Sequence, residues 1–172
     1  MAITVRKVAP TETKALAMFA EACFRQSFGY LFPDEALDSL CARAFAPALL
    51  EALIAQGAWV AEAAEGSEGW RGYAALSLDP CPVPGLAEPH LELSRLYVDA
   101  TWQGQGISDA LMEAFMAEAR QRQARAVWLE AFEGNPRALH FYARWGFQDL
   151  GGRDSLREGL RLPHRILATQ LS

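Results

Sequence analysis

Two glycines lie at the entrance of an expected helix, directly after an apolar strand. The segment reads LYVDATWQGQGIS, with Gly104 and Gly106 two positions apart. Glycine lets the backbone turn sharply and approach a ligand closely, and the unpaired amides at a helix N-terminus favour negative charge. The pattern predicts an anion site, although two glycines alone are equally typical of an ordinary helix-entry turn.

Two other phosphate-binding motifs do not fit the chain. A dinucleotide fingerprint G-x-G-x-x-G would need glycine at position 109, where the chain has Asp109. A P-loop needs the run G-K-[ST], which does not occur in the sequence. The anion site, if present, therefore belongs to another class.

The run Gln103–Ser108 resembles the Q/R-x-x-G-x-G/A motif of the GCN5-related N-acetyltransferase (GNAT) family, with Ser108 at the last position. A second run, NPRALHFYARWGF, is similar to the family signature N-x-x-A-x-x-F-Y-x-x-x-G-F. The resemblance is strongest over residues 91–150 and is nearest to the spermidine/spermine N-acetyltransferases of the PaiA type. It implies transfer of an acetyl group from acetyl-coenzyme A to a primary amine of a small molecule or peptide.

The resemblance also implies which residues bind the cosubstrate acetyl-coenzyme A, with no metal involved. Backbone amides from Gln103 to Ser108 would hold the pyrophosphate, and the backbone of Leu96 and Val98 would pair with the pantetheine like an added strand. We expect a bulge near Leu96 and a splay between strands 90–98 and 126–132. The implied cofactor-binding residues are Leu96, Tyr97, Val98, Gln103, Gly104, Gln105, Gly106, Ile107, Ser108, Asn135 and Ala138.

Amine acetylation needs a neutral amine and a proton for the departing thiolate. Tyr142 matches the general acid of the family, although a tyrosine on the apolar face of a helix is by itself typical of a core aromatic. Glu92 lies on the same strand face as Leu96 and Val98, so it is a candidate general base, directly or through water. A surface ion pair is the alternative for Glu92, and Glu130 is a weaker candidate for the base.

Hydrophobic periodicity and turn residues predict the elements that position these groups. We expect Thr11 and Asn135 to cap helices, a glycine-rich turn at 65–69, and Gly146 to end the last helix. Strands are expected at 3–9, 58–64, 70–78, 90–98, 126–132, 147–150 and 165–171, and helices at 11–27, 33–56 with a break at Pro47, 105–123 and 136–145. The order predicts an α+β fold, a GNAT-like mixed and mostly antiparallel central sheet with helices on both faces.

Length, net charge and cysteine spacing limit the other functional classes to which the chain could belong. The 172 residues are expected to form one domain, 1–172, and the formal net charge of -5 argues weakly against a nucleic-acid partner. The three cysteines have no metal-ligand spacing, and no signal peptide or membrane-spanning segment is recognisable. We therefore expect a cytoplasmic protein with no membrane partner, and the sequence leaves monomer and homodimer equally open.

The acceptor and two non-enzymatic alternatives stay open at this point. Polyamine-type relatives usually carry an acidic stretch before the last strand, whereas this chain carries four arginines there, which would repel a polycation. An acceptor bearing a carboxylate, a protein N-terminus and a lysine remain open, and the loop 79–89 is expected to help decide between them. A non-catalytic acyl-coenzyme A sensor and an interaction module built on residues 15–53 are the alternatives. The arginines are Arg153, Arg157, Arg161 and Arg165, and the histidines His90, His140 and His164 are expected to be structural or exposed.

Overall fold

The helices and strands follow the predicted order, with the helical stretch before the second strand divided at Pro47. The computed structural model describes residues 2–63 and 69–172, so the predicted glycine-rich turn lies almost wholly outside the described residues. The elements are β1 (Ile3–Lys7), α1 (Thr13–Phe28), α2 (Asp34–Ala44), α3 (Pro47–Gln56), β2 (Ala58–Ala63), β3 (Trp70–Ser77), β4 (His90–Val98), α4 (Ile107–Gln121), β5 (Ala126–Phe132), α5 (Pro136–Arg144), β6 (Gln148–Arg157) and β7 (Leu160–Gln170).

The strands form a seven-stranded mixed sheet in the order β1-β2-β3-β4-β5-β7-β6. The pairs β1–β2, β2–β3, β5–β7 and β6–β7 are antiparallel, whereas β4 and β5 are parallel. Only His90–Glu92 of β4 pair in register with β5 among the described residues. The rest of β4 continues without this pairing, which agrees with the predicted splay between the two strands. The α+β fold with helices flanking a mixed sheet is confirmed.

The chain divides into two compact units, and β4 and α4 each contribute to both. The first unit holds residues up to Ser77 together with Arg95–Ala117, and the second holds Leu78–Ser94 together with Glu118–Ser172. The expected single domain 1–172 stays a prediction.

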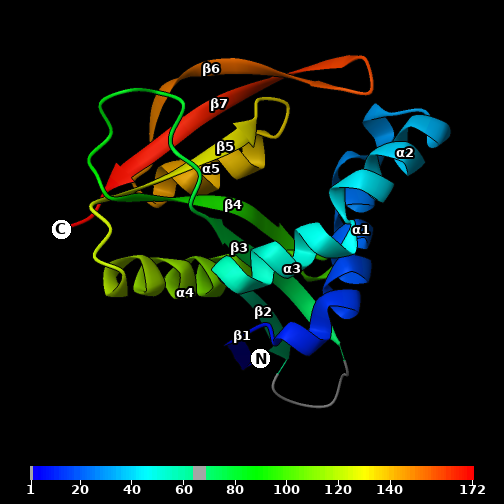
Figure 1. Ribbon diagram of the computed structural model, residues 1–172, viewed down its shortest axis with the longest axis horizontal. Helices are drawn as coiled ribbons and strands as arrows, with labels where there is room; N and C mark the ends of the chain where they lie inside the picture. The colour runs from blue at the N-terminus through cyan, green and yellow to red at the C-terminus, as the bar shows by residue number, and fades with distance from the viewer. Residues whose placement is uncertain (1, 64–68) are drawn as a thin grey trace. The chain divides into compact units, whose positions relative to one another are not determined.

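In the first unit, α1 and α3 pack on each other and α3 contacts β2 and β3 (Figure 1). Leu16 of α1, Leu50 of α3 and Val60 of β2 are each 0% exposed, so these three elements share one apolar core. On β3, a Cβ added to Gly72 would lie 2.8 Å from the backbone oxygen of Tyr97 and 2.9 Å from a side-chain carbon of Ile107. This close approach explains why a glycine interrupts an otherwise apolar strand.

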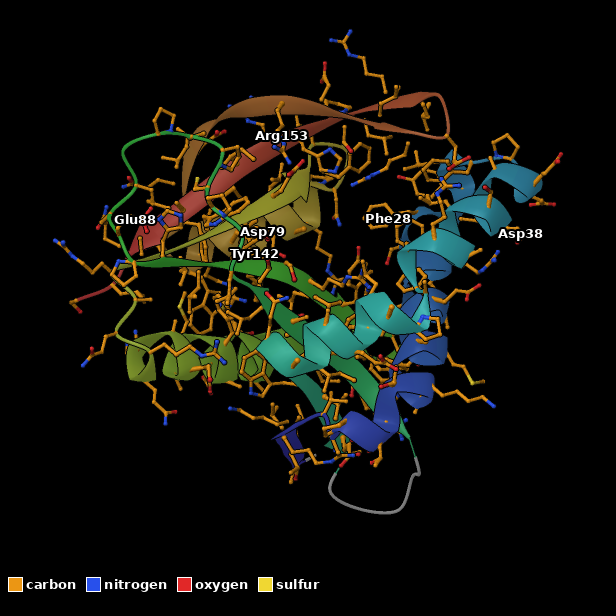
Figure 2. All side chains as sticks on the ribbon, viewed as in Figure 1. Phe28, Asp38, Asp79, Glu88, Tyr142 and Arg153 are labelled. Carbon is orange, nitrogen blue, oxygen red and sulfur yellow. The ribbon has the colours of Figure 1, made fainter. Side chains whose placement is uncertain are left out.

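In the second unit, the proline-rich loop between β3 and β4 is packed down on the sheet. Cys81, Val83 and Leu86 of the loop contact a buried cluster formed by Trp128 of β5 with Ile166 and Ala168 of β7. The indole nitrogen of Trp128 also donates a 3.3 Å hydrogen bond to the backbone oxygen of Asp79, which Figure 2 labels in this loop. Burial of these apolar side chains holds the loop to the unit.

The predicted cap of the first helix is wrong. Helix α1 begins at Thr13, because residues 10–12 form a 3-10 turn before it. The carboxylate of Glu12 accepts a 2.8 Å hydrogen bond from the amide of Ala9 and a 2.9 Å bond from Arg6. The Glu12 carboxylate thus binds an amide and a guanidinium ahead of the helix, and no side-chain hydrogen bond among the described residues caps the first turn of α1.

The last two strands are longer than predicted. Strands β6 and β7 form a ribbon that closes at Glu158 and Gly159, whose φ values are 47° and 77°. Two consecutive positive φ values match the twist of a two-residue hairpin turn. Most of β6 is exposed and polar, so no apolar alternation marked it in the sequence.

Replacing Gly72 with alanine is expected to lower the free energy of unfolding by about 1–3 kcal/mol, because the methyl group overlaps the backbone of Tyr97. Urea unfolding followed by circular dichroism measures the change. Gly29→Ala is the matched control, because its Cβ would lie at an ordinary 3.4 Å from Leu37 at a φ of -56°. Equal stability of the Gly72 variant and the wild type would contradict the close approach.

Candidate functional site

The glycine turn before α4 has the backbone conformation that an anion site requires. Gly104 and Gly106 have φ values of 78° and 82°, a region that side chains disfavour. The first intrahelical hydrogen bond runs over 3.0 Å from the amide of Ala110 to the oxygen of Gly106. The amides of Ile107 and Ser108 therefore precede the helical ladder and have no intrahelical acceptor.

The predicted helix start at residue 105 is wrong by two positions, because the positive φ at Gly106 cannot belong to a right-handed helix. The helix instead begins at Ile107, which is 1% exposed and anchors the first turn in the core. The N-terminus of the helix, with the positive end of its dipole, therefore lies within the second half of the predicted pyrophosphate segment Gln103–Ser108.

A hydrogen-bond network holds the chain that leads into the turn. Asp99 accepts a 2.9 Å bond from the amide of Thr101, a 2.6 Å bond from its hydroxyl and a 3.2 Å bond from the side chain of Gln26. The Thr101 hydrogen bonds hold the pKa of the Asp99 carboxyl below its usual range. Gln26 also accepts from the amide of Ala100 at 3.1 Å, which ties this segment to α1.

The ring of Trp102, directly before Gln103, packs under the guanidinium of Arg71 at 4.4 Å from the ring centroid. Arg71 lies on β3 and is 8% exposed. Position 102 is thereby fixed from the sheet as well as from α1, so both ends of the segment before the turn are held.

The predicted pantetheine residues on β4 differ in their surroundings. Val98 is buried, whereas Leu96 and Tyr97 are partly exposed. The ring of Tyr97 stacks on the ring of Tyr73 at 5.6 Å, with 10° between the planes. Tyr97 is therefore engaged in a structural stack, and its contact with the cofactor, like the bulge near Leu96, stays a prediction.

Tyr142 is held rigidly near the end of α5. Its backbone oxygen accepts the amide of Phe147 at 3.1 Å, while the amide of Gly146 donates to the oxygen of Ala143 at 3.0 Å. With the φ of 85° at Gly146, these bonds form a Schellman motif, as the sequence predicted for the helix end. The Tyr142 ring contacts Phe147 at 5.8 Å, and the residue is 9% exposed.

The other end of α5 is capped as predicted. The side-chain oxygen of Asn135 accepts a 3.2 Å hydrogen bond from the amide of Ala138, and Pro136 occupies the first helical position. This cap gives Asn135 and Ala138 a structural role, which explains why these residue types suit the two motif positions without any contact with a ligand. Their predicted contact with the cofactor is untested.

The two candidate bases differ in what holds them. Glu92 on β4 is half-buried and pairs in register with Trp128 of β5. Glu130, two positions further along β5, accepts a 2.7 Å hydrogen bond from Arg153 of β6, which Figure 2 labels. Glu130 is thus held in an ion pair, and the role of either carboxylate as a base stays a prediction.

The basic character predicted for the C-terminal segment is largely compensated. Arg153 pairs with Glu130, Arg161 pairs with Asp154, and Arg165 pairs with Asp149 and Glu133. The Arg165 guanidinium holds the pKa of the Asp149 carboxyl below its usual range. The repulsion of a polycation, expected from the sequence, is correspondingly weaker.

The histidines have the structural or exposed positions expected of them. The Nε2 of His90 accepts a 3.0 Å hydrogen bond from the amide of Cys81, so its ring proton sits on Nδ1 and the ring anchors the loop before β4. His164 makes a 2.9 Å contact between Nδ1 and the oxygen of Leu162, and His140 is exposed.

Sequence reasoning missed two polar groups in the first unit. Arg95 of β4 lies on the strand face of Leu93 and Tyr97, and Tyr73 of β3 is 0% exposed. A charged residue on an apolar strand face was the available signal, and it was not used. Among residues 2–63 and 69–172, no group of three or more metal-ligating side chains gathers, and no helix has the length and apolar composition of a membrane span.

Comparisons with known proteins agree with these features. An uncharacterized N-acetyltransferase of Mycobacterium tuberculosis (strain ATCC 25618 / H37Rv) is 41% identical over 63 residues, which are 37% of this chain and 40% of that protein. Spermine/spermidine N(1)-acetyltransferase of Bacillus subtilis (strain 168) is 32% identical over 63 residues, covering 36% of this chain and 41% of that protein. The matches thus span about two fifths of the length of these curated relatives.

The fold is similar to that of the PaiA N-acetyltransferase from Thermoplasma acidophilum, solved in complex with coenzyme A. The TM-score is 0.74 at 16% identity, over 99% of this chain and 100% of that one. The Acetyltransferase (GNAT) family profile matches residues 16–147, which include the glycine turn, both candidate bases and Tyr142. Because this match covers most of the chain, the chain belongs to the acetyltransferase (GNAT) family.

Proposed function

We propose that the protein transfers an acetyl group from acetyl-coenzyme A to a primary amine of a small molecule or a peptide. The observation that carries the proposal is the glycine turn at Gly104 and Gly106, which leaves the first amides of α4 without intrahelical acceptors. Membership of the acetyltransferase family supports this reading. The amine acceptors named for the Bacillus subtilis relative support an amine as acceptor.

The turn fits a diphosphate group. A Cβ built on Gly106 would meet no atom within 4 Å, so the backbone there borders open space. Backbone N–H donors at the positive end of a 15-residue helix suit an anion, and the small Ser108 adds a hydroxyl donor. Acetyl-coenzyme A would bring the acetyl group as a thioester, activated for attack by an amine.

In the proposed reaction, Glu92 accepts a proton from the ammonium form of the acceptor, directly or through water. The neutral nitrogen then forms a bond to the acetyl carbon, the carbon–sulfur bond breaks, and the second proton that the nitrogen loses as the amide forms restores the Tyr142 phenol. The hydroxyl of Tyr142 supplies the proton that the departing thiolate takes up. The capping bonds at both ends of α5 support this role for Tyr142, because they hold the backbone that carries its side chain.

Gly106→Ala is expected to weaken the binding of acetyl-coenzyme A by about tenfold or more, which corresponds to ~1.4 kcal/mol. The new side chain disfavours the positive φ and fills space beside the amides. Gly159→Ala is the matched control, since Gly159 has a φ of 77° and also no atom within 4 Å of its Cβ. Calorimetric titration of both variants measures the difference, and equal affinities would refute the assignment of the turn.

Tyr142→Phe is expected to lower kcat about 10²-fold while the affinity for acetyl-coenzyme A stays unchanged, because only the proton donor is lost. The phenyl ring keeps the contacts with Phe141 and Phe147, so the melting temperature should stay within a few degrees. Steady-state thiol release and thermal unfolding give the two readouts. Loss of stability with unchanged kcat would identify Tyr142 as a core residue.

Glu92→Gln is expected to lower kcat/KM about 10²-fold at neutral pH, and the deficit should shrink as the pH rises toward the pKa of the amine, about 10. At high pH the acceptor is already neutral, so it no longer needs a base. Glu130→Gln is the control and should leave the pH profile unchanged. A pH profile of Glu92→Gln parallel to that of the wild type would exclude Glu92 as the base.

A further inference from the structure

The glycine turn before α4 is exposed between two residues that are held more firmly. Residues 103–106 are exposed, whereas Ile107, which follows them, is 1% exposed, and Trp102, which precedes them, is partly buried. An exposed segment gains little from packing of its own. The shape of the turn therefore depends on what holds the residues at its two ends.

Two neighbouring residues of β3 contact these two ends within the first unit. The guanidinium carbon of Arg71 lies 4.4 Å from the centroid of the Trp102 ring. At Gly72, an added Cβ would lie 2.9 Å from a side-chain carbon of Ile107, so Ile107 packs directly on the strand. Because β3 is an interior strand of the sheet, it gives both ends of the turn a firm support.

The two ends differ in how they are secured. Ile107 is fixed by burial in the core, whereas Trp102 ends the short 3-10 turn Ala100–Trp102, in which its amide donates a 2.9 Å hydrogen bond to the oxygen of Asp99. A single 3-10 turn has poor hydrogen-bond geometry and is a weak element by itself. The contact with Arg71 is thus what ties the Trp102 ring to the sheet.

The charge of Arg71 also acts on the start of the same segment. The hydrogen bonds from Thr101 are the main cause that holds the pKa of the Asp99 carboxyl below its usual range, and the positive charge of Arg71 adds to their effect. Arg71 is 8% exposed, and a cation attracts an aromatic ring more strongly when it is withdrawn from water. One guanidinium therefore attracts both the first and the last residue of the segment Asp99–Trp102.

We propose that Arg71 is a positioning residue for the pyrophosphate turn, on which it acts through Trp102. The inference rests on the proposed function and deepens it, because it assigns part of the affinity for acetyl-coenzyme A to a residue outside both sequence motifs. While Trp102 is held, the amides of the turn keep their directions before the cofactor binds, so less conformational freedom is lost on binding. Arg71 itself needs no contact with the cofactor, and no covalent step is involved.

The test compares calorimetric titrations with acetyl-coenzyme A and with acetyl-pantetheine, which lacks the pyrophosphate. Arg71→Met removes the guanidinium and keeps an unbranched apolar stem, while Trp102→Leu removes the ring and Trp102→Phe keeps one. Arg95→Met is the matched control, because the Arg95 guanidinium lies over another ring of the same unit, at 5.2 Å from the centroid of Phe45. Trp102 is partly exposed, so its variants remain informative if Arg71→Met fails to fold.

We expect Arg71→Met and Trp102→Leu each to weaken the binding of acetyl-coenzyme A about tenfold and to change that of acetyl-pantetheine by less than about twofold. The KM for acetyl-coenzyme A should rise while kcat at saturation stays unchanged. The double variant should bind about as well as either single variant, because both changes remove one contact. Trp102→Phe should keep most of the affinity, and Arg95→Met should leave the ratio of the two affinities unchanged. Equal weakening for both compounds, or a wild-type ratio in Arg71→Met and Trp102→Leu, would overturn the proposal.

A readout without any ligand separates this proposal from the proposed function. Nuclear magnetic relaxation gives the order parameters of the Gly104 and Gly106 amides, which should fall from about 0.85 in the wild type to below about 0.6 in Arg71→Met and Trp102→Leu. If they fall while the wild type binds neither compound, the role of Arg71 in the turn is upheld and the acetyltransferase proposal is refuted. If the order parameters and the affinity ratio both stay at their wild-type values, the positioning role is refuted and the acetyltransferase proposal stands.

Discussion

The conformation of the backbone at Gly104 and Gly106 is the constraint on which the proposed chemistry depends. Positive φ at these two positions turns the chain from β4 into α4 and leaves the first amides of the helix unused by its own ladder. The approach to this turn is fixed by the acceptor groups of Asp99 and by the stack of Arg71 on Trp102. A ligand that pairs with such amides gains from a geometry already set before it binds, and this preorganisation lowers the cost of binding.

Charge compensation is the second organising feature. Arginines of the C-terminal ribbon pair with carboxylates of β5 and β6, and Arg6 lies between Glu12 and Glu62 near the N-terminus. These pairs are largely exposed and contribute little to stability each, but they neutralise segments that look strongly basic in the sequence. Arg95 differs from them, because its guanidinium meets a backbone oxygen and an aromatic ring instead of a carboxylate.

Local signals in the sequence were sufficient for the elements that carry the two motifs. The bounds of β4 and β5, the Asn135 cap and the Gly146 end of α5 were all predicted, because each depends on hydrogen bonds or φ values within a few residues. The Thr11 cap and the short last strands were wrong, since the ion pair of Glu12 with Arg6 and a polar cross-strand ladder decide those segments. The burial of Tyr73 and the partial burial of Arg95 were missed, because burial of a strand residue depends on tertiary packing, which alternation along one strand does not report.

The most direct test of the account compares calorimetric titrations of the wild-type protein with acetyl-coenzyme A and with acetyl-pantetheine, which lacks the pyrophosphate and the nucleotide. If the turn before α4 holds the pyrophosphate, acetyl-coenzyme A should bind at one site per chain and at least about 10²-fold more tightly, a difference of ~2.7 kcal/mol. The advantage should shrink as salt is added, because the contacts are to an anion. Equal affinity for the two compounds, or no binding of either, would contradict the account.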